Sequence, residues 1–501
     1  MTLELSGQRL TLEQIVRVAT AQDQAILAGS ARDRMEDSRH IVEQVLLEDR
    51  AVYGINTGFG KLSDVRIPPS ELDRLQLNLV RSHACGVGRP LSEPETRAMM
   101  LLRANVLAVG LSGCRVDLVS TLVAMLERGV LPRIPEKGSV GASGDLAPLA
   151  HLALSMIGEG TSQYHGAWMD GARALAAAEI EPVRLKAKEG LALLNGTQAM
   201  SAVGALALFR AERIASLSDL AGVMTLEALR DTPAAFDERI HAARPHAGQQ
   251  ASAKHLRELV AGSEIRQSHL QNDPRVQDAY SLRCIPQVHG AVRGALHHAR
   301  EAVEVESGSA TDNPLVFPGG DILSGGNFHG APLALAFDYC AIALTTLMSI
   351  AERRIDRLVN PDLNEGLPPF LSSHAGISSG FMIAQVCAAA LLNEARVLAH
   401  PASVDNIPTS GGKEDHVSMG MTAALKLRQT VENAENVLAI ELLAAAEGLD
   451  YRAPLRSSKP IERARELIRS MAPRVTEDRP LSPDIERLSE SIRAGEFDEF
   501  I

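Results

Sequence analysis

Aromatic residues are scarce in this chain of 501 residues: Phe, Trp and Tyr together make up 3% of it, and there is a single Trp. Ala and Leu are abundant instead, and long Ala/Leu/Glu/Arg stretches recur without the Val/Ile/Thr alternation that is typical of strands. With 45% hydrophobic residues the chain can still bury a large core. We therefore expect a mainly α-helical globular protein.

An excess of positive charge is also lacking. The 50 Lys and Arg residues are outnumbered by 62 Asp and Glu residues, which gives a formal net charge of −12. Binding a nucleic acid or an anionic membrane would require a basic face that neutralises phosphate groups. We therefore expect a small-molecule partner, and neither a nucleic acid nor a membrane.

Closely spaced cysteine pairs are missing too. The five Cys residues lie far apart, and no CxxC motif joins any two of them. An odd number of cysteines, behind an N-terminus without a charged and then apolar leader, favours reduced thiols and a cytoplasmic location. The sequence gives no sign of a metal site, and we expect none.

Glycine motifs that bind nucleotide phosphates are absent as well. The stretch GINTGFGK lacks a glycine five positions before Gly60, and no GxGxxG follows a strand-like run. The adjacent His297 and His298 do not have the i, i+4 spacing of a metal-binding pair. No external cofactor is therefore expected.

Five long stretches have the composition of helices, and several exceed twenty residues. They run over residues 197–229, 287–307, 331–359, 380–400 and 419–447. We expect Gly448 to terminate the last of them as a C′ residue. The apolar stretch within 331–359 is long enough to cross a bilayer, but it contains Asp338, and we interpret it as the central helix of a bundle.

Three portions are expected along the chain. Residues 1–110 mix short helical patterns with glycine-rich turns and form an N-terminal portion that carries active-site loops. Residues 111–453 form a long central helical bundle, and residues 454–501 a more polar, helical C-terminal segment.

The stretch GSVGASGDLAP at residues 138–148 is unusually flexible for a chain so rich in helix formers. At its centre, Gly144 has no side chain, so its nitrogen can approach the carbonyl of Ala142. Attack with loss of water, followed by departure of the Ser143 hydroxyl as a second water, gives a methylidene-imidazolone ring. Its electrophilic double bond can accept an amine, which no ordinary side chain does.

An Ala-Ser-Gly tripeptide alone more often belongs to a flexible loop before a helix. Here Asp145 is placed to cap the helix that follows, with Pro148 in its first turn. The positive end of that helix would face the tripeptide and favour negative charge on the ring.

The longer stretch resembles the signature of the ammonia-lyase family, whose members make this group from Ala-Ser-Gly. Other blocks resemble the family in the same order and cover nearly the whole chain: YGINTGFGKL, SHACGVG, LLNGTQAM, VQDAYSLRCIPQVHGA, DNPLVF, GGNFHG and EDHVSMG. The resemblance implies the ammonia-lyase (fumarase/aspartase-like) superfamily architecture. It also implies a 4-methylidene-imidazol-5-one formed autocatalytically from Ala142, Ser143 and Gly144, and a homotetramer whose active sites are shared between subunits.

Resemblance to the histidine-specific members implies elimination of ammonia from L-histidine to give trans-urocanate, the first step of histidine degradation. Tyr53 and Tyr280 would handle protons, and we favour Tyr280 for removing the β-proton. Arg283, three residues after Tyr280, would bind the substrate carboxylate with its planar fork. Asn195 would contact the substrate amine and orient the ring, although Asn before Gly also suits a helix N-cap.

Further matching positions are expected to line the pocket: Gln277, Asn313 and Phe328. His83 and Glu414 would select the imidazole ring, because a pocket whose polar groups are left unpaired by an apolar ring rejects it. Two departures affect this selectivity. Lys413 precedes Glu414 and would alter its proton affinity if the two paired, and Cys85 places a thiol near the site.

Two alternatives stay open. A tyrosine or phenylalanine ammonia-lyase, or a 2,3-aminomutase, would share the prosthetic group, but His83 and Glu414 together argue against an apolar ring. A catalytically inactive helical paralogue would share the fold, but the presence of Tyr53, Ser143 and Tyr280 argues against it.

Overall fold

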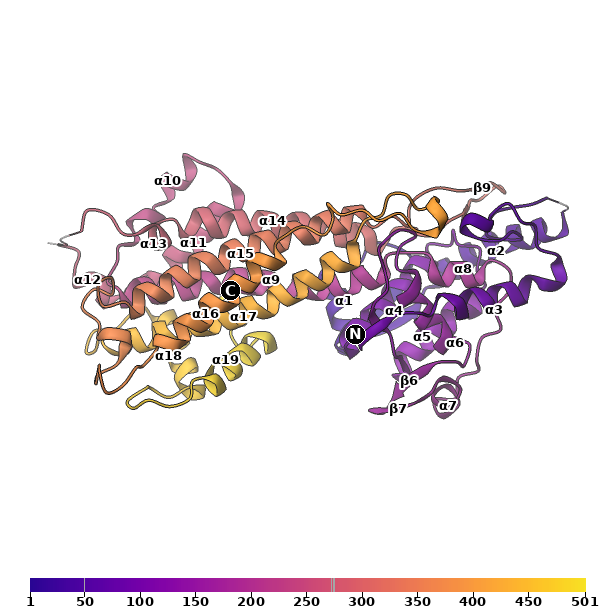
Figure 1. The fold of residues 1–501 in the computed structure, drawn as a ribbon. Helices are drawn as coiled ribbons and strands as arrows, with labels where there is room; N and C mark the ends of the chain where they lie inside the picture. The colour runs from indigo at the N-terminus through magenta and orange to yellow at the C-terminus, as the bar shows by residue number, and fades with distance from the viewer. Residues whose placement is uncertain (49, 272, 274) are drawn as a thin grey trace. The chain divides into compact units, whose positions relative to one another are not determined.

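A computed structural model of the chain describes residues 1–48, 50–271, 273 and 275–501 (Figure 1). Its contacts divide it into two compact units. Unit 1 comprises Met1–Phe209, Ala299–Asp338 and Pro401–Leu425, and unit 2 comprises Arg210–His298, Tyr339–His400 and Lys426–Ile501. The described chain is mainly helical, as its composition predicts.

The N-terminal part of unit 1 packs helices around α4, which is buried along almost its whole length. Capping boxes start two of these helices: Thr11 and Gln14 bond reciprocally at α1, and Ser92 and Glu95 do so at α4. The elements are the parallel pair β1 (Thr2–Leu5) and β2 (Gln24–Leu27), and the helices α1 (Leu12–Ala19), α2 (Gly29–Leu47), α3 (Leu72–His83), α4 (Glu93–Ala108) and α5 (Val116–Arg128).

The remainder of unit 1 contains the short strands and helices that hold the glycine-rich loop. Strand β3 (Val87–Pro90) pairs antiparallel with β5 (Pro135–Lys137), which leads directly into the loop. The other elements are the sheet of β4 (Leu131–Pro132), β6 (Thr161–Tyr164) and β7 (Ala167–Asp170), the hairpin of β8 (Leu315–Val316) and β9 (Ile322–Leu323), and the helices α6 (Leu146–Met156), α7 (Gly171–Ala177) and α8 (Glu189–Leu194).

Unit 2 is built on long helices, seen as parallel rods in Figure 1. Buried polar bonds join neighbours: His289 of α14 bonds Asp219 of α9, and Arg354 of α15 pairs with Glu441 of α17. The helices wholly within unit 2 are α10 (Glu238–Ala242), α11 (Ala247–Val260), α12 (Glu264–Gln267), α13 (Tyr280–Arg283), α16 (Met382–Leu398), α18 (Lys459–Met471) and α19 (Ser482–Ala494). The long helices α9 (Gln198–Ala228), α14 (Ile285–Ser307), α15 (Ala331–Val359) and α17 (Gly420–Asp450) have their greater part in unit 2 and one end in unit 1. Short 3₁₀ turns occupy Gly60–Leu62, Pro69–Glu71, Pro233–Phe236, Pro369–Leu371, Ser410–Gly412 and Asp498–Phe500.

The five long helices expected from the sequence are all present, with ends that differ by a few residues. The prediction that Gly448 ends α17 is wrong, because the helix continues to Asp450. A Cβ on Gly448 would lie 2.9 Å from the Cβ of Ala228, so this glycine permits close approach of two helices. Helix α15 is long and apolar enough to cross a membrane, but 67% of its apolar window is buried within the protein.

Candidate active site

The glycine-rich loop lies between β5 and α6 and is fixed by segments far away in the sequence. The Val140 carbonyl accepts from the Met419 amide at 2.9 Å, and the Gly141 carbonyl accepts from Ser418 Oγ at 3.0 Å. The backbone of Gly141 has a φ of +68° and that of Gly144 +73°, values that glycine adopts without a Cβ penalty. The stretch that looks flexible in sequence is therefore held in one unusual shape.

Gly144 lies directly against Gly196, the residue after Asn195. The two residues form a parallel bridge, and the amide of Asp145 donates to the Gly196 carbonyl at 2.7 Å. A Cβ at Gly144 would overlap that carbonyl. The close approach of the two backbones thus requires glycine at position 144, independently of any chemistry.

Asp145 occupies the N-cap position of α6, but its side chain makes no capping bond there. Its Oδ2 accepts from the Met200 amide in the first turn of α9 at 2.8 Å, and its Oδ1 accepts from Ser139 Oγ at 2.7 Å. The predicted cap is therefore wrong in its target, because the carboxylate satisfies α9 and not its own helix. Pro148 lies in the first turn of α6, as predicted.

Asn195 binds the central residue of the tripeptide. Its Nδ2 donates to the Ser143 carbonyl at 2.9 Å, whereas its Oδ1 is buried and has no hydrogen-bond partner. Asn195 follows α8 as its C-cap residue, so the alternative role as an N-cap is wrong. A buried amide oxygen without a partner marks a place where a donor on a ligand can bind.

Ser143 and Asn195 line a cavity of about 300 Å³ in unit 1. Most of the positions singled out in the sequence meet there, from six separate segments of the chain. The lining includes Tyr53, His83, Ser143, Asn195, Asn313, Phe328 and Glu414.

Glu414 is the one acidic side chain in this lining. Its carboxylate accepts from Ser143 Oγ at 2.8 Å, from Thr409 Oγ1 at 2.6 Å and from Ser410 Oγ at 2.7 Å. Burial raises the pKa of Glu414, but these three hydroxyl donors outweigh burial, and the net pKa lies below its ordinary value. The lowered pKa means that the Glu414 carboxylate is charged at neutral pH. No ion pair joins it to Lys413 within the part of the chain that the structure describes, so hydroxyl groups hold it in place.

His83 ends α3 and faces the same cavity. Its Nδ1 lies 2.8 Å from the Leu79 carbonyl oxygen, which can only accept, so Nδ1 carries the proton. When the ring carries no second proton, its Nε2 atom is a hydrogen-bond acceptor.

Tyr53 packs edge-on against Phe59, with ring centroids 6.5 Å apart. Burial raises the pKa of Tyr53, and the charges of Glu414 and Asp312 raise it further, against a hydrogen bond with the Gly60 backbone. With its pKa raised, Tyr53 keeps its proton at neutral pH, which suits a proton donor.

Asn313 and Phe328 reach the cavity from the segment between α14 and α15. The side-chain Oδ1 of Asn313 accepts from the Gly325 backbone amide at 2.7 Å, and the backbone amide of Asn313 donates to Asp312 Oδ1 at 2.7 Å. Asp312 in turn pairs with Lys188 at 2.8 Å, with both side chains fully buried. The ion pair fixes the backbone that places Asn313.

Gln277, Tyr280 and Arg283 belong to unit 2 and do not line this cavity. Tyr280 is 71% exposed, and the Arg283 guanidinium carbon lies 4.6 Å from the centre of its ring, so the two share a face of α13 as expected. The Nε of Arg283 is buried without a partner, and no carboxylate pairs with this arginine among the described residues.

Several lining residues were not singled out from the sequence: Phe59, Leu62, Leu79, Leu146, Leu191, Leu194 and Ser410. Leu194 lies in LLNGTQAM and Phe59 in YGINTGFGKL, so these two motifs contained the signal, whereas Leu191 lies two residues before the first of them. Thr409 and Ser410 belong to a loop that is closed by an isolated antiparallel β-bridge between Thr409 and Glu414. No sequence pattern in this loop predicts that bridge.

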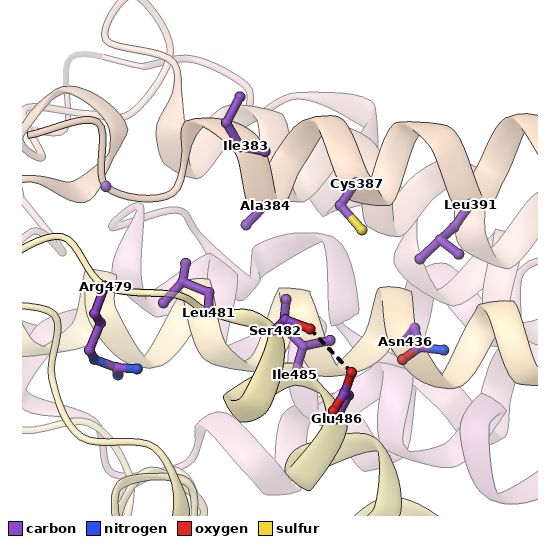
Figure 2. A pocket seen from close by; sticks show the side chains of 11 residues that line it. Ile383, Ala384, Cys387, Leu391, Asn436, Arg479, Leu481, Ser482, Ile485 and Glu486 are labelled. Carbon is purple, nitrogen blue, oxygen red and sulfur yellow. Dashed lines mark hydrogen bonds between the residues drawn. The ribbon is translucent and has the colours of Figure 1, made fainter.

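Other hollows lie elsewhere in the described structure. One of about 320 Å³ shares Ser143, His83 and Glu414 with the first and is also lined by the exposed thiol of Cys85, as expected for a thiol near the site. Another, of about 490 Å³, lies in unit 2 between α16, α17 and the start of α19, where Ala384 and Cys387 of α16 point toward Leu481 and Ile485 (Figure 2). It holds no residue that the sequence analysis singled out. No group of three metal-binding side chains occurs among the described residues.

Comparisons with known proteins agree with this geometry. The model of the aromatic amino acid lyase family matches residues 10–470. A histidine ammonia-lyase of Koribacter versatilis is 56% identical over 99% of this chain and 98% of its own length.

Solved structures give the same relationship. The crystal structure of histidine ammonia-lyase from Trypanosoma cruzi superimposes with a TM-score of 0.93 at 43% identity, covering 100% of this chain and 95% of that one. Tyrosine aminomutase from Streptomyces globisporus superimposes with a TM-score of 0.95 at 38% identity, covering 100% and 98%. The architecture expected from the sequence is therefore confirmed.

Proposed function

The chain belongs to the aromatic amino acid lyase family, and from this premise we propose that it deaminates L-histidine to trans-urocanate and ammonia. The observation that carries the proposal is the arrangement around Ser143, where Asn195 binds the backbone carbonyl and Glu414 binds the hydroxyl within one cavity. A carbon–nitrogen lyase needs an electrophile for the amine, and the remaining contacts serve to hold and select the substrate.

The residues at the loop fit a methylidene-imidazolone formed from Ala142, Ser143 and Gly144. Gly144 has the positive φ and the crowded Cβ position that only glycine tolerates, and the Asn195 Oδ1 is buried and unpartnered beside the tripeptide. When present, the group supplies an electron-poor double bond that takes the amine. The chain forms it without an external cofactor.

The other residues bind the substrate and move protons. Asn195 holds the Ser143 carbonyl through Nδ2 and offers Oδ1 to an amine. Tyr53, which keeps its proton, donates, and we assign removal of the β-proton to Tyr280. Arg283, which pairs with no carboxylate among the residues that the structure describes, binds the substrate carboxylate as a bidentate fork.

Selection of the imidazole ring falls to Glu414 and His83. Glu414 offers a charged carboxylate, and His83 an Nε2 acceptor, so a ring with N–H groups pairs with them whereas phenyl leaves both unpaired. This favours histidine over the phenylalanine, tyrosine and aminomutase alternatives. Gln277, Asn313 and Phe328 would complete the pocket.

Assembly into a homotetramer with shared sites is part of the proposal. Tyr280 and Arg283 are outside the unit 1 cavity, which agrees with their acting in a site of a neighbouring subunit. All five cysteines are unpaired, which agrees with a cytoplasmic enzyme.

Replacing Ser143 by Ala tests the proposal. The variant should lose turnover of L-histidine by at least about 10³-fold, since it removes the electrophile and leaves binding groups intact. Urocanate absorbance measures the rate, and intact mass should show wild type lighter by two waters than its sequence requires. L-Tyrosine and L-phenylalanine serve as comparison substrates. Normal turnover in the variant contradicts the proposal.

A further inference from the structure

The two carboxylate oxygens of Glu414 have different partners. Oε2 accepts from Thr409 Oγ1 and Ser410 Oγ, which belong to the same loop as Glu414. Oε1 accepts from Ser143 Oγ at 2.8 Å. The first two bonds fix the side chain in place, whereas the third ties it to the one hydroxyl that the proposed ring formation removes.

Ring formation, which is part of the proposed function, removes a hydrogen-bond donor from Glu414, as an account of the atoms shows. The Gly144 nitrogen bonds to the Ala142 carbonyl carbon, and the carbonyl oxygen leaves as water with the amide hydrogens of Gly144 and Ser143. Ser143 then loses its Cα hydrogen and its hydroxyl as a second water, which creates the double bond. No oxidant or reductant is needed, and afterwards Ser143 has no O–H to give to Oε1.

We propose that ring formation unmasks the acceptor for the substrate's ring. In the unprocessed chain Oε1 is occupied by the Ser143 hydroxyl, and in the processed chain it is free to accept an N–H from an imidazole. A part-buried carboxylate oxygen that has lost its donor has an unmet hydrogen bond. An imidazole N–H restores that bond, and bonds to charged acceptors are the stronger ones.

The acceptor that His83 offers to the ring does not change in this way. His83 Nδ1 donates to the Leu79 carbonyl, so Nε2 of the neutral ring is already an acceptor before processing. Of the two groups proposed to select the imidazole, processing therefore alters only Glu414. The ability to bind an imidazole N–H through Glu414 arises together with the electrophile, and an unprocessed chain is unable to bind the ring in the same manner.

Titration with imidazole and with N-methylimidazole at a pH at which both are neutral, so that only imidazole has an N–H, tests this inference. Calorimetry would give the dissociation constants for wild type, Ser143→Ala, which has neither hydroxyl nor ring, and Ser143→Thr, which keeps a hydroxyl. Wild type and Ser143→Ala should prefer imidazole by about tenfold or more, the effect of one bond to a charged group. Unprocessed Ser143→Thr should show no such preference, and adding Glu414→Gln to Ser143→Ala should abolish it.

Intact mass establishes which chains are processed. If Ser143→Thr loses two waters, Gly144→Ala takes its place, since it keeps the Ser143 hydroxyl and crowds Gly196. The inference would be overturned if Ser143→Ala and an unprocessed chain with the hydroxyl preferred imidazole over N-methylimidazole equally. It would also be overturned if Ser143→Ala lacked the preference for imidazole that wild type shows. A wild type that retains both waters would refute the proposed ring alone, and it should then bind like Ser143→Thr.

Discussion

Asp145 serves two elements with one carboxylate, since it starts α6 by position and caps α9 by its hydrogen bond to Met200. Burial raises the pKa of Asp145 to about 6, although bonds from Met200 and Ser139 oppose the shift. A carboxyl with a raised folded-state pKa stabilises the fold below its ordinary pKa near 3.8, and that contribution is lost as the pH rises to about 6.

The pH dependence of stability should therefore change in Asp145→Asn, which cannot ionise. Between pH 4 and pH 6, the free energy of unfolding of wild type should fall relative to the variant by up to about 3 kcal/mol, the equivalent of two pKa units. Urea unfolding across this range measures the difference, with the exposed Asp37→Asn of α2 as the control for substitution. A difference that is independent of pH would refute the assignment.

At the scale of elements, glycine has opposite effects in two helices of unit 2. A Cβ at Gly448 of α17 would press on Ala228 at 2.9 Å, whereas a Cβ at Gly294 of α14 would meet nothing within 4 Å. The first glycine allows two helices to pack closely, and the second only adds flexibility to the unfolded chain.

Gly448→Ala should therefore lower the free energy of unfolding by about 1–3 kcal/mol through overpacking. The matched Gly294→Ala should raise it by about 0.5–1 kcal/mol, because alanine is the better helix former. Thermal and urea unfolding of both variants measure the two signs. Stabilisation by Gly448→Ala would contradict the packing account.

At the scale of the whole molecule, the residues proposed for catalysis are split between the unit 1 cavity and α13 of unit 2. If the sites are shared between subunits, co-expression of Ser143→Ala with Tyr280→Phe should restore activity, since some sites then combine two intact halves. Urocanate formation by the purified mixed oligomer measures this. A mixture as inactive as each variant alone would indicate sites built within one chain.

The sequence predicts the long helices well because their apolar composition extends over twenty residues or more. It also brings together part of the predicted site, since Tyr53, Asn195 and Glu414 lie within recognisable blocks and line the cavity, whereas Tyr280 and Arg283 do not. It misdirects the cap at Asp145, because the partner amide is 55 residues away and local spacing favours the adjacent helix. The hydroxyl groups that bind Glu414 were not predicted either, because Ser143 is 271 residues away and the contacts of Thr409 and Ser410 depend on how their loop folds.

The contacts around the glycine-rich loop also limit when, during synthesis of the chain, the loop can reach its final conformation. The loop is held by Gly196 and Met200 on one side and by Ser418 and Met419 on the other. A nascent chain from which Met419 has not yet emerged from the ribosome contains the tripeptide but lacks the contacts that Ser418 and Met419 make with the loop. We therefore expect the proposed cyclisation to take place late in synthesis, when most of the polypeptide has already left the exit tunnel.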